Sequence, residues 1–422
     1  MYQVADSSVL VRGTRALTGS KSTARVSRTV LLLGATSMFT DISSEMVTTI
    51  MPLYLIFSLG LSPLQFGVID GIQGGAAALV RIAAGFTADR FGRYKEVAVA
   101  GYGISAFCRI GLLLVGKSWG VIGALVFADR TGKGIRTAPR DAMISLSTPP
   151  EQLGLAFGVH RALDTAGAVI GPLLAFLLLV MLPQGYHAIF FVSFCFALIG
   201  LSILVLFVQN RPEDRVDTEP LPPLTMKAAA RLVAIPKFTV LLVAGGALAL
   251  ATMSDGFVYL GLRDNLNFAG RNLPLLYVAT SLVYMLLAVP AGRLADRIGR
   301  AKVFVGGYSL LLIVYAAIVL PGLGPAASLV VIIAFGAYYA ATDGVLSAMA
   351  SALLPPEARA TGLSLLTTVT SIGRLIASIA FGAAWVLIGV HAAVIVFAVG
   401  LIVAAVLAAF ILTRYGREPA HA

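Results

Sequence analysis

Six charged side chains crowd into residues 128–143, between flanks that are apolar. They are Asp129, Arg130, Lys133, Arg136, Arg140 and Asp141. The flanks, 121–127 and 142–146, have the composition of membrane-buried chain, where a charge is costly. At about 100° per residue, Asp129, Lys133, Arg136 and Arg140 share one helix face, and Arg130 and Asp141 line the adjacent one. Such a stripe cannot face lipid, so we expect it to face either water or counter-charges.

Counter-charges stand at matching depth in two other apolar stretches. Asp41 and Glu45 are one helical turn apart, as are His160 and Asp164, which have Arg161 beside them. Carboxyls inside a membrane are candidates for carrying protons or binding cations. An ion-pair network that only holds helices together is the structural alternative.

Other charges are scattered through the apolar chain. Three of them, Asp255, Asp343 and Arg374, are isolated in the second half but belong to the candidate substrate or proton pathway. Three more are interpreted as helix-packing partners outside the site: Asp70, Arg81 and Arg109.

The composition requires a membrane around these residues. Of 422 residues, 58% are hydrophobic and 12% charged, far from the usage of a soluble domain. Apolar runs long enough to cross a bilayer recur without the alternation of barrel strands, which predicts an all-α integral membrane protein. The basic excess then reports orientation rather than a nucleic-acid partner. Cys108 and Cys195 both lie in apolar runs, which argues against disulfides or a zinc cluster.

Twelve helices are expected along the chain. Their ranges are 29–58, 64–88, 96–116, 119–146, 151–181, 186–208, 237–262, 272–295, 303–320, 327–354, 358–388 and 390–413. Residues 209–236, rich in proline and charge, predict a cytoplasmic linker between two six-helix bundles, 29–208 and 237–413. Residues 1–28 and 414–422 are expected to be tails.

The basic residues predict the orientation. Segments on the side of the termini hold twenty Lys and Arg, whereas the opposite loops hold three. The positive-inside rule therefore places both termini in the cytoplasm.

One loop occurs twice, each time after the second helix of a half. Gly85-Phe-Thr-Ala-Asp-Arg-Phe-Gly-Arg-Tyr-Lys95 returns as Gly292-Arg-Leu-Ala-Asp-Arg-Ile-Gly-Arg-Ala-Lys302. Two such copies, about two hundred residues apart, indicate an internal duplication. Within twelve helices split six and six, this loop resembles that of the major facilitator superfamily over residues 29–413.

The resemblance implies a secondary transporter with two pseudo-symmetric bundles and alternating access. It implies a cavity lined by helices 1, 4, 7 and 10, each of which carries an acid here. It also implies a charge latch that stabilises one access state, although the loop's arginines could merely fix topology. The latch residues are Gly85, Asp89, Arg90, Gly92, Arg93, Gly292, Asp296, Arg297, Gly299 and Arg300.

The fifth helix resembles the family's antiporter motif through Gly158, Gly167, Gly171 and Pro172, although Ala175 and Phe176 replace its last glycines. The same small residues would also let helices pack closely. Export is therefore favoured only by resemblance. No cofactor is expected, because a proton or ion gradient would drive transport. The substrate is expected to be a small molecule or an ion. The protein is expected to be a monomer in the bacterial inner membrane.

The string Gly-Lys-Gly-Ile-Arg-Thr-Ala-Pro-Arg-Asp-Ala resembles a bacterial subgroup of the superfamily, including magnetosome-membrane permeases of the MamH type. That narrower likeness would imply iron transport, for which Asp41, Glu45, His160 and Asp164 offer suitable ligands. Whether a metal binds is left open.

Two other classes compete with a transporter. A membrane enzyme has little support, because His160 and Asp164 have the wrong spacing for an acyltransferase and no protease or nucleophile motif occurs. A non-transporting sensor or scaffold is the other, and the absence of an appended soluble domain speaks against it.

Overall fold

The computed structural model describes residues 26–91, 93–149, 152–209, 232–265, 270–320, 325–355 and 359–415, which form helices joined by short turns and loops and contain no strand. The helices are α2 (Arg28–Leu53), continued by a π-helix (Tyr54–Ser58), α3 (Pro63–Phe91), α4 (Tyr94–Leu114), α5 (Trp119–Leu146), α6 (Leu153–Met181), α7 (Tyr186–Phe207), α9 (Pro236–Leu250), α10 (Asp255–Asn265), α11 (Leu273–Ile298), α12 (Arg300–Val319), α13 (Pro325–Leu353), α14 (Arg359–Ile388) and α15 (Val390–Tyr415). The all-α fold class is confirmed.

Nine helices of the described residues are long and apolar enough to cross a membrane, counting α9 and α10 as one span. The remaining long helices are α2, α3 and α5, and α2 and α5 carry the charged residues on which the sequence analysis centres. The predicted tails and linker lie largely outside the described residues.

The predicted helix 237–262 is wrong in one respect, because it is broken between α9 and α10. The hydroxyl of Thr252 donates to the carbonyl of Leu248, and the amide of Met253 donates to the hydroxyl of Tyr315 over 2.7 Å. Ser and Thr side chains compete for backbone groups in this way. The tyrosine hydroxyl on α12 thus accepts from a backbone amide that would donate to a carbonyl of its own helix if that helix were continuous.

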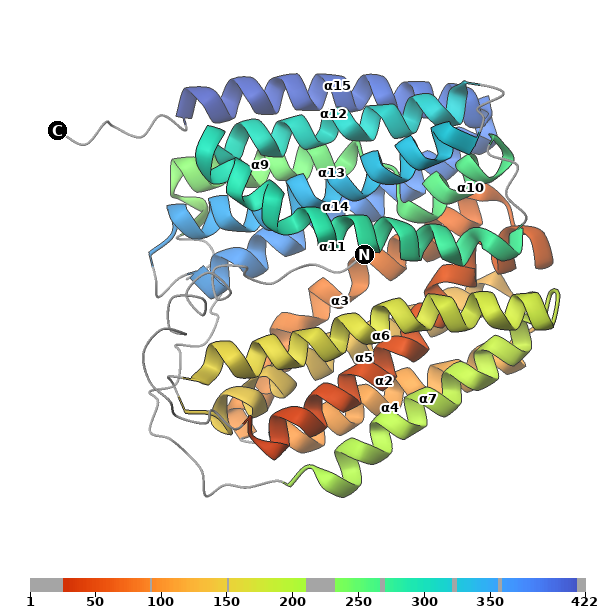
Figure 1. The fold of residues 1–422 in the computed structure, drawn as a ribbon, viewed down its shortest axis with the longest axis vertical. Helices are drawn as coiled ribbons and strands as arrows, with labels where there is room; N and C mark the ends of the chain where they lie inside the picture. Colours follow the sequence, from red (N-terminus) through yellow and green to blue (C-terminus); the bar gives the residue numbers. More distant parts are fainter. Residues whose placement is uncertain are drawn as a thin grey trace. The chain divides into compact units, whose positions relative to one another are not determined.

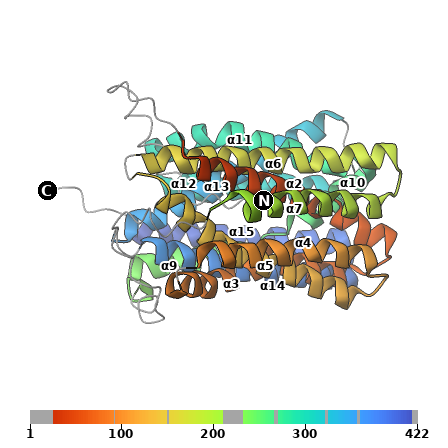
Figure 2. The same ribbon diagram turned by 90° about the horizontal axis from the view of Figure 1, so that it is seen from below.

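The chain forms two compact units. Unit 2 comprises Ser7–Tyr54 and Ala76–Pro223, and unit 1 includes Leu55–Gly75 and Leu224–Ala422. Within unit 2, α2 packs along α6 and α7, and α4 packs along α5 (Figure 1). Within unit 1, α13 packs against α11 and α12, and α9 against α14 (Figure 2). Each unit can therefore position its own buried polar residues.

The close approach of α6 to α2 depends on glycines of α6. A Cβ on Gly167 would lie 2.4 Å from the carbonyl oxygen of Met38, and one on Gly171 would lie 2.7 Å from that of Ile42. Gly158, two turns earlier on α6, has nothing within 4 Å of such a Cβ. Gly167 and Gly171 therefore hold the backbone of α2 against α6, as small residues do in membrane helices.

We predict that Gly167→Ala destabilises the protein by about 1–3 kcal/mol, because the added methyl would meet rigid backbone. Thermal unfolding of the purified protein in detergent measures this, with Gly158→Ala as the matched control. The two variants should differ clearly in melting temperature. Equal effects would contradict the packing described for α2 and α6.

Candidate functional site

The deepest part of the charged stretch is an ion-pair cluster between α4 and α5. Arg109 of α4 donates through Nη2 to Oδ1 of Asp129 over 2.9 Å. Arg130 approaches Oδ2 of the same carboxylate to 3.2 Å and donates to the hydroxyl of Ser44 on α2 over 3.3 Å. All three charged side chains are at most 10% exposed. One carboxylate therefore compensates two buried guanidinium groups.

Arg136, two turns further along α5, lies against α4 in a different way. Its Nη1 donates to the hydroxyl of Ser105 over 3.2 Å, and its guanidinium carbon lies 4.6 Å from the centre of the Tyr102 ring. The helices approach closely here, since a Cβ on Gly132 would lie 2.6 Å from the carbonyl oxygen of Gly101. A hydroxyl and an aromatic face, rather than a carboxylate, stabilise this buried cation.

Arg140 connects several helices of unit 2. Its Nε and Nη2 donate to Oδ1 of Asp141 over 2.9 and 2.8 Å, and its Nη1 donates to the hydroxyl of Ser37 over 3.3 Å. That hydroxyl also lies 3.0 Å from Nε2 of His160 and 3.2 Å from the hydroxyl of Tyr102. Side chains of α2, α4, α5 and α6 thus form one polar network.

Two carboxyl groups meet between α2 and α6. Asp41 and Asp164 are both buried and interact electrostatically with each other. Two carboxylates held close together repel each other, which disfavours ionisation of both. Arg161 approaches Asp164 to 3.6 Å, and Lys133 interacts electrostatically with Asp41 and Glu45. The two carboxyl groups are therefore a candidate site for binding and releasing a proton.

The predicted stripe therefore meets both α4 and α2. Asp129 and Arg136 contact α4, whereas Arg130 and Arg140 contact α2, so counter-charges and hydroxyl groups face much of it. Arg109, interpreted from the sequence as a helix-packing partner, pairs with Asp129 on the neighbouring helix. This pair could have been predicted from the sequence, because the two residues are 20 positions apart on neighbouring helices that a short loop joins.

The charges of unit 1 are not isolated either, which corrects the expectation for the second half. Nη2 of Arg374 on α14 lies 3.4 Å from Oδ1 of Asp343 on α13. Asp255, at the start of α10, accepts a hydrogen bond from the hydroxyl of Tyr339 on α13. These partners belong to different helices, so sequence spacing could not identify them.

Asp70 was interpreted as a packing residue, and it makes a specific contact within unit 1. The hydroxyl of Ser378 on α14 donates to its Oδ2 over 2.8 Å. A Cβ on the nearby Gly67 would lie 2.5 Å from the carbonyl oxygen of Ser378. A half-buried carboxylate and a glycine thus hold the first part of α3 to α14.

The second copy of the repeated loop is visible in full. Arg300 donates through Nε and Nη2 to Oδ1 of Asp296 over 3.1 and 2.9 Å, and through Nη1 to the carbonyl of Ala348 on α13 over 3.3 Å. Gly299 turns the chain from α11 into α12 with a φ of +105°, which suits glycine. Gly85, Asp89, Arg90 and Gly92 of the first copy lie outside the described side chains.

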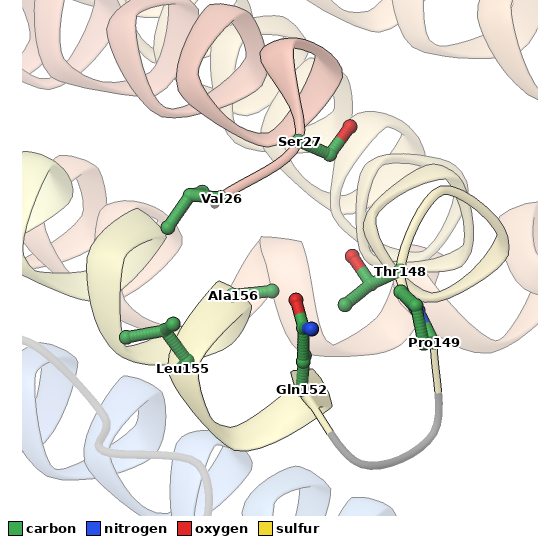
Figure 3. A pocket seen from close by; sticks show the side chains of 7 residues that line it. All are labelled: Val26, Ser27, Thr148, Pro149, Gln152, Leu155 and Ala156. Carbon is green, nitrogen blue, oxygen red and sulfur yellow. The ribbon is translucent and has the colours of Figure 1, made fainter. Parts of the chain in front are cut away.

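The small pocket in Figure 3 lies apart from these clusters and is lined by uncharged residues: Val26, Ser27, Thr148, Pro149, Gln152, Leu155 and Ala156. It includes none of the predicted site residues. Among the described residues no group of three or more His, Cys, Asp or Glu side chains gathers as metal ligands.

Comparison with known proteins decides the family. The sequence pattern described as Major Facilitator Superfamily matches residues 33–270 and 240–422. The chain belongs to the Major Facilitator Superfamily. An uncharacterized transporter of this type from Methanocaldococcus jannaschii is 34% identical over 376 residues, which cover 85% of this chain and 89% of that protein.

Solved structures of the superfamily share the fold. The nucleoside transporter NupG matches with a TM-score of 0.74 at 14% identity, over 93% of this chain and 100% of that one. A bacterial homolog of the human lysosomal transporter Spinster matches with a TM-score of 0.73 at 17% identity, over 93% and 98%. The protein is thus a multi-pass membrane transporter, and its superfamily is a non-enzyme class that moves small molecules across membranes.

We predict that Asp129→Asn lowers stability by about 3–5 kcal/mol, because it leaves Arg109 and Arg130 buried without their counter-charge. Asp296→Asn, which removes an exposed ion pair, should cost about 0–1 kcal/mol. Thermal unfolding in detergent compares the two. If Asp129→Asn proves as mild as Asp296→Asn, then the buried cluster does not hold α4 and α5 together.

Proposed function

We propose that this protein is a proton-coupled secondary transporter that exports a small solute or ion by alternating access. Supporting the proposal most directly are the buried carboxyl groups of Asp41 and Asp164, which interact with each other between α2 and α6. Two carboxylates held this close repel each other, so the pair is suited to binding and releasing a shared proton.

The surroundings of the pair suit reversible protonation. Lys133 interacts with Asp41, and Arg161 with Asp164, so a second negative charge on the pair would be stabilised by cations already in place. The hydroxyl of Ser37 connects His160 to Arg140 nearby. A change in the protonation of the pair would therefore alter contacts among α2, α5 and α6 together.

Outward transport is the direction we favour. Gly167 and Gly171 of the helix that resembles the antiporter motif hold α6 against α2, beside the carboxyl pair. The basic residues of the loops support a cytoplasmic membrane location with both termini inside.

We predict that Asp41→Asn abolishes proton exchange, because an amide cannot give up the shared proton. Everted membrane vesicles from a bacterial host, acidified by respiration and followed with a pH-sensitive dye, measure this exchange. A panel of nucleosides, peptides, organic cations and carboxylates is added in turn. A transported solute should dissipate the gradient in wild-type vesicles and leave it intact with Asp41→Asn.

Lys117→Gln, in the exposed loop before α5, provides the matched control and should behave as wild type. The proposal fails if Asp41→Asn responds to the same solutes as wild type does. It also fails if no solute of the panel distinguishes wild-type vesicles from vesicles that lack the protein.

A further inference from the structure

The charges inside unit 2 do not balance. Apart from Arg28, Lys95 and Glu96 at helix ends, its helices contain six basic side chains that the structure describes, Arg109, Arg130, Lys133, Arg136, Arg140 and Arg161, and five acidic ones, Asp41, Glu45, Asp129, Asp141 and Asp164. The basic side chains therefore outnumber the acidic ones in a region of low dielectric constant, where a charge is costly unless an opposite charge approaches.

Two of these acids, Asp129 and Asp141, already form ion pairs with arginines. Asp129 accepts from Arg109 and contacts Arg130, and Asp141 accepts both hydrogen bonds of the Arg140 fork. Arg136, by contrast, forms no ion pair with any residue in the described part of the chain. Its neighbours supply a hydroxyl and an aromatic ring, neither of which cancels its charge.

Unused hydrogen-bond donors accompany the excess charge. The Nε atoms of Arg109 and Arg130 are buried and have no acceptor among the described residues. Guanidinium groups in such positions normally have acceptors, and the oxygens of carboxylates and phosphates match their geometry. Arg130 holds only a 3.3 Å hydrogen bond to Ser44 on the side of α2. Its guanidinium can therefore exchange a weak partner for a stronger one.

We propose that the substrate is an anion that carries a carboxylate or phosphate group and binds within unit 2 at Arg130, Lys133 and Arg140. This inference rests on the proposed transport function and names the charge class of its substrate. Arg130 and Arg140 both reach α2, where Ser44 and Ser37 lie seven residues apart on one face. Lys133 stands on α5 between the two arginines and interacts with Asp41 and Glu45.

The test is thermal unfolding of the purified full-length chain in detergent at constant ionic strength set with chloride. Succinate and inorganic phosphate are compared with succinamide, which has the shape of succinate without its charges, and with the cation tetraphenylphosphonium. We expect at least one of the two anions to raise the melting temperature, and succinamide and the cation to leave it unchanged. For Arg130→Gln, the anion concentration that gives the same rise in melting temperature should be about tenfold higher or more. Lys117→Gln should respond as the wild type does.

The inference is overturned if neither anion stabilises the wild-type protein, or if the anions act equally on wild type and Arg130→Gln. The comparison of succinate with succinamide needs only the wild-type protein, so it decides the matter even if Arg130→Gln fails to fold. The outcome is separable from that of the proposed function. If the vesicles show proton-coupled movement of a cation or a neutral solute, the transport function is supported and the anionic substrate is not. If the anions bind but no proton exchange is seen, the anion site is supported and the proton-coupled function is not.

Discussion

The constraint on which this structure depends is that a charge buried inside a membrane protein is costly unless an opposite charge lies close to it. The carboxylate of Asp129 meets this demand for Arg109 and Arg130, with side chains that are at most 10% exposed. Because these side chains are buried from solvent, the ion pairs hold α5 against α4. Hydroxyl groups of α2 accept hydrogen bonds from arginines of α5, so a third helix joins this polar network.

This compensation also separates structural from functional charge. Asp129 holds two cations in place, whereas Asp41 and Asp164 are two acids that interact with each other. An ion pair of the first kind is costly to break, and in the proposed function the pair of acids binds and releases a proton. The proposal thus combines a rigid part, between α4 and α5, with a part whose charge changes, between α2 and α6.

Much of the fold could be predicted from the sequence, because each span is a long apolar run that ends at polar residues. The helix expected at 119–146 is found at those bounds, and the family followed from a loop that occurs twice. The break between α9 and α10 could not be predicted, since it depends on the Tyr315 hydroxyl of another helix. Partners such as Arg374 for Asp343 were missed for the same reason: periodicity gives the face of a helix but not its neighbour.

The measurement that tests the central claim most directly is infrared difference spectroscopy of the purified protein during a rise in pH. A protonated carboxyl shows a carbonyl stretching band that disappears when the proton leaves. Our account predicts a band in the wild type that is lost in both Asp41→Asn and Asp164→Asn and is kept in Asp296→Asn. If neither Asp41→Asn nor Asp164→Asn removes any band, the result would contradict the shared proton, and with it the proposed coupling between α2 and α6.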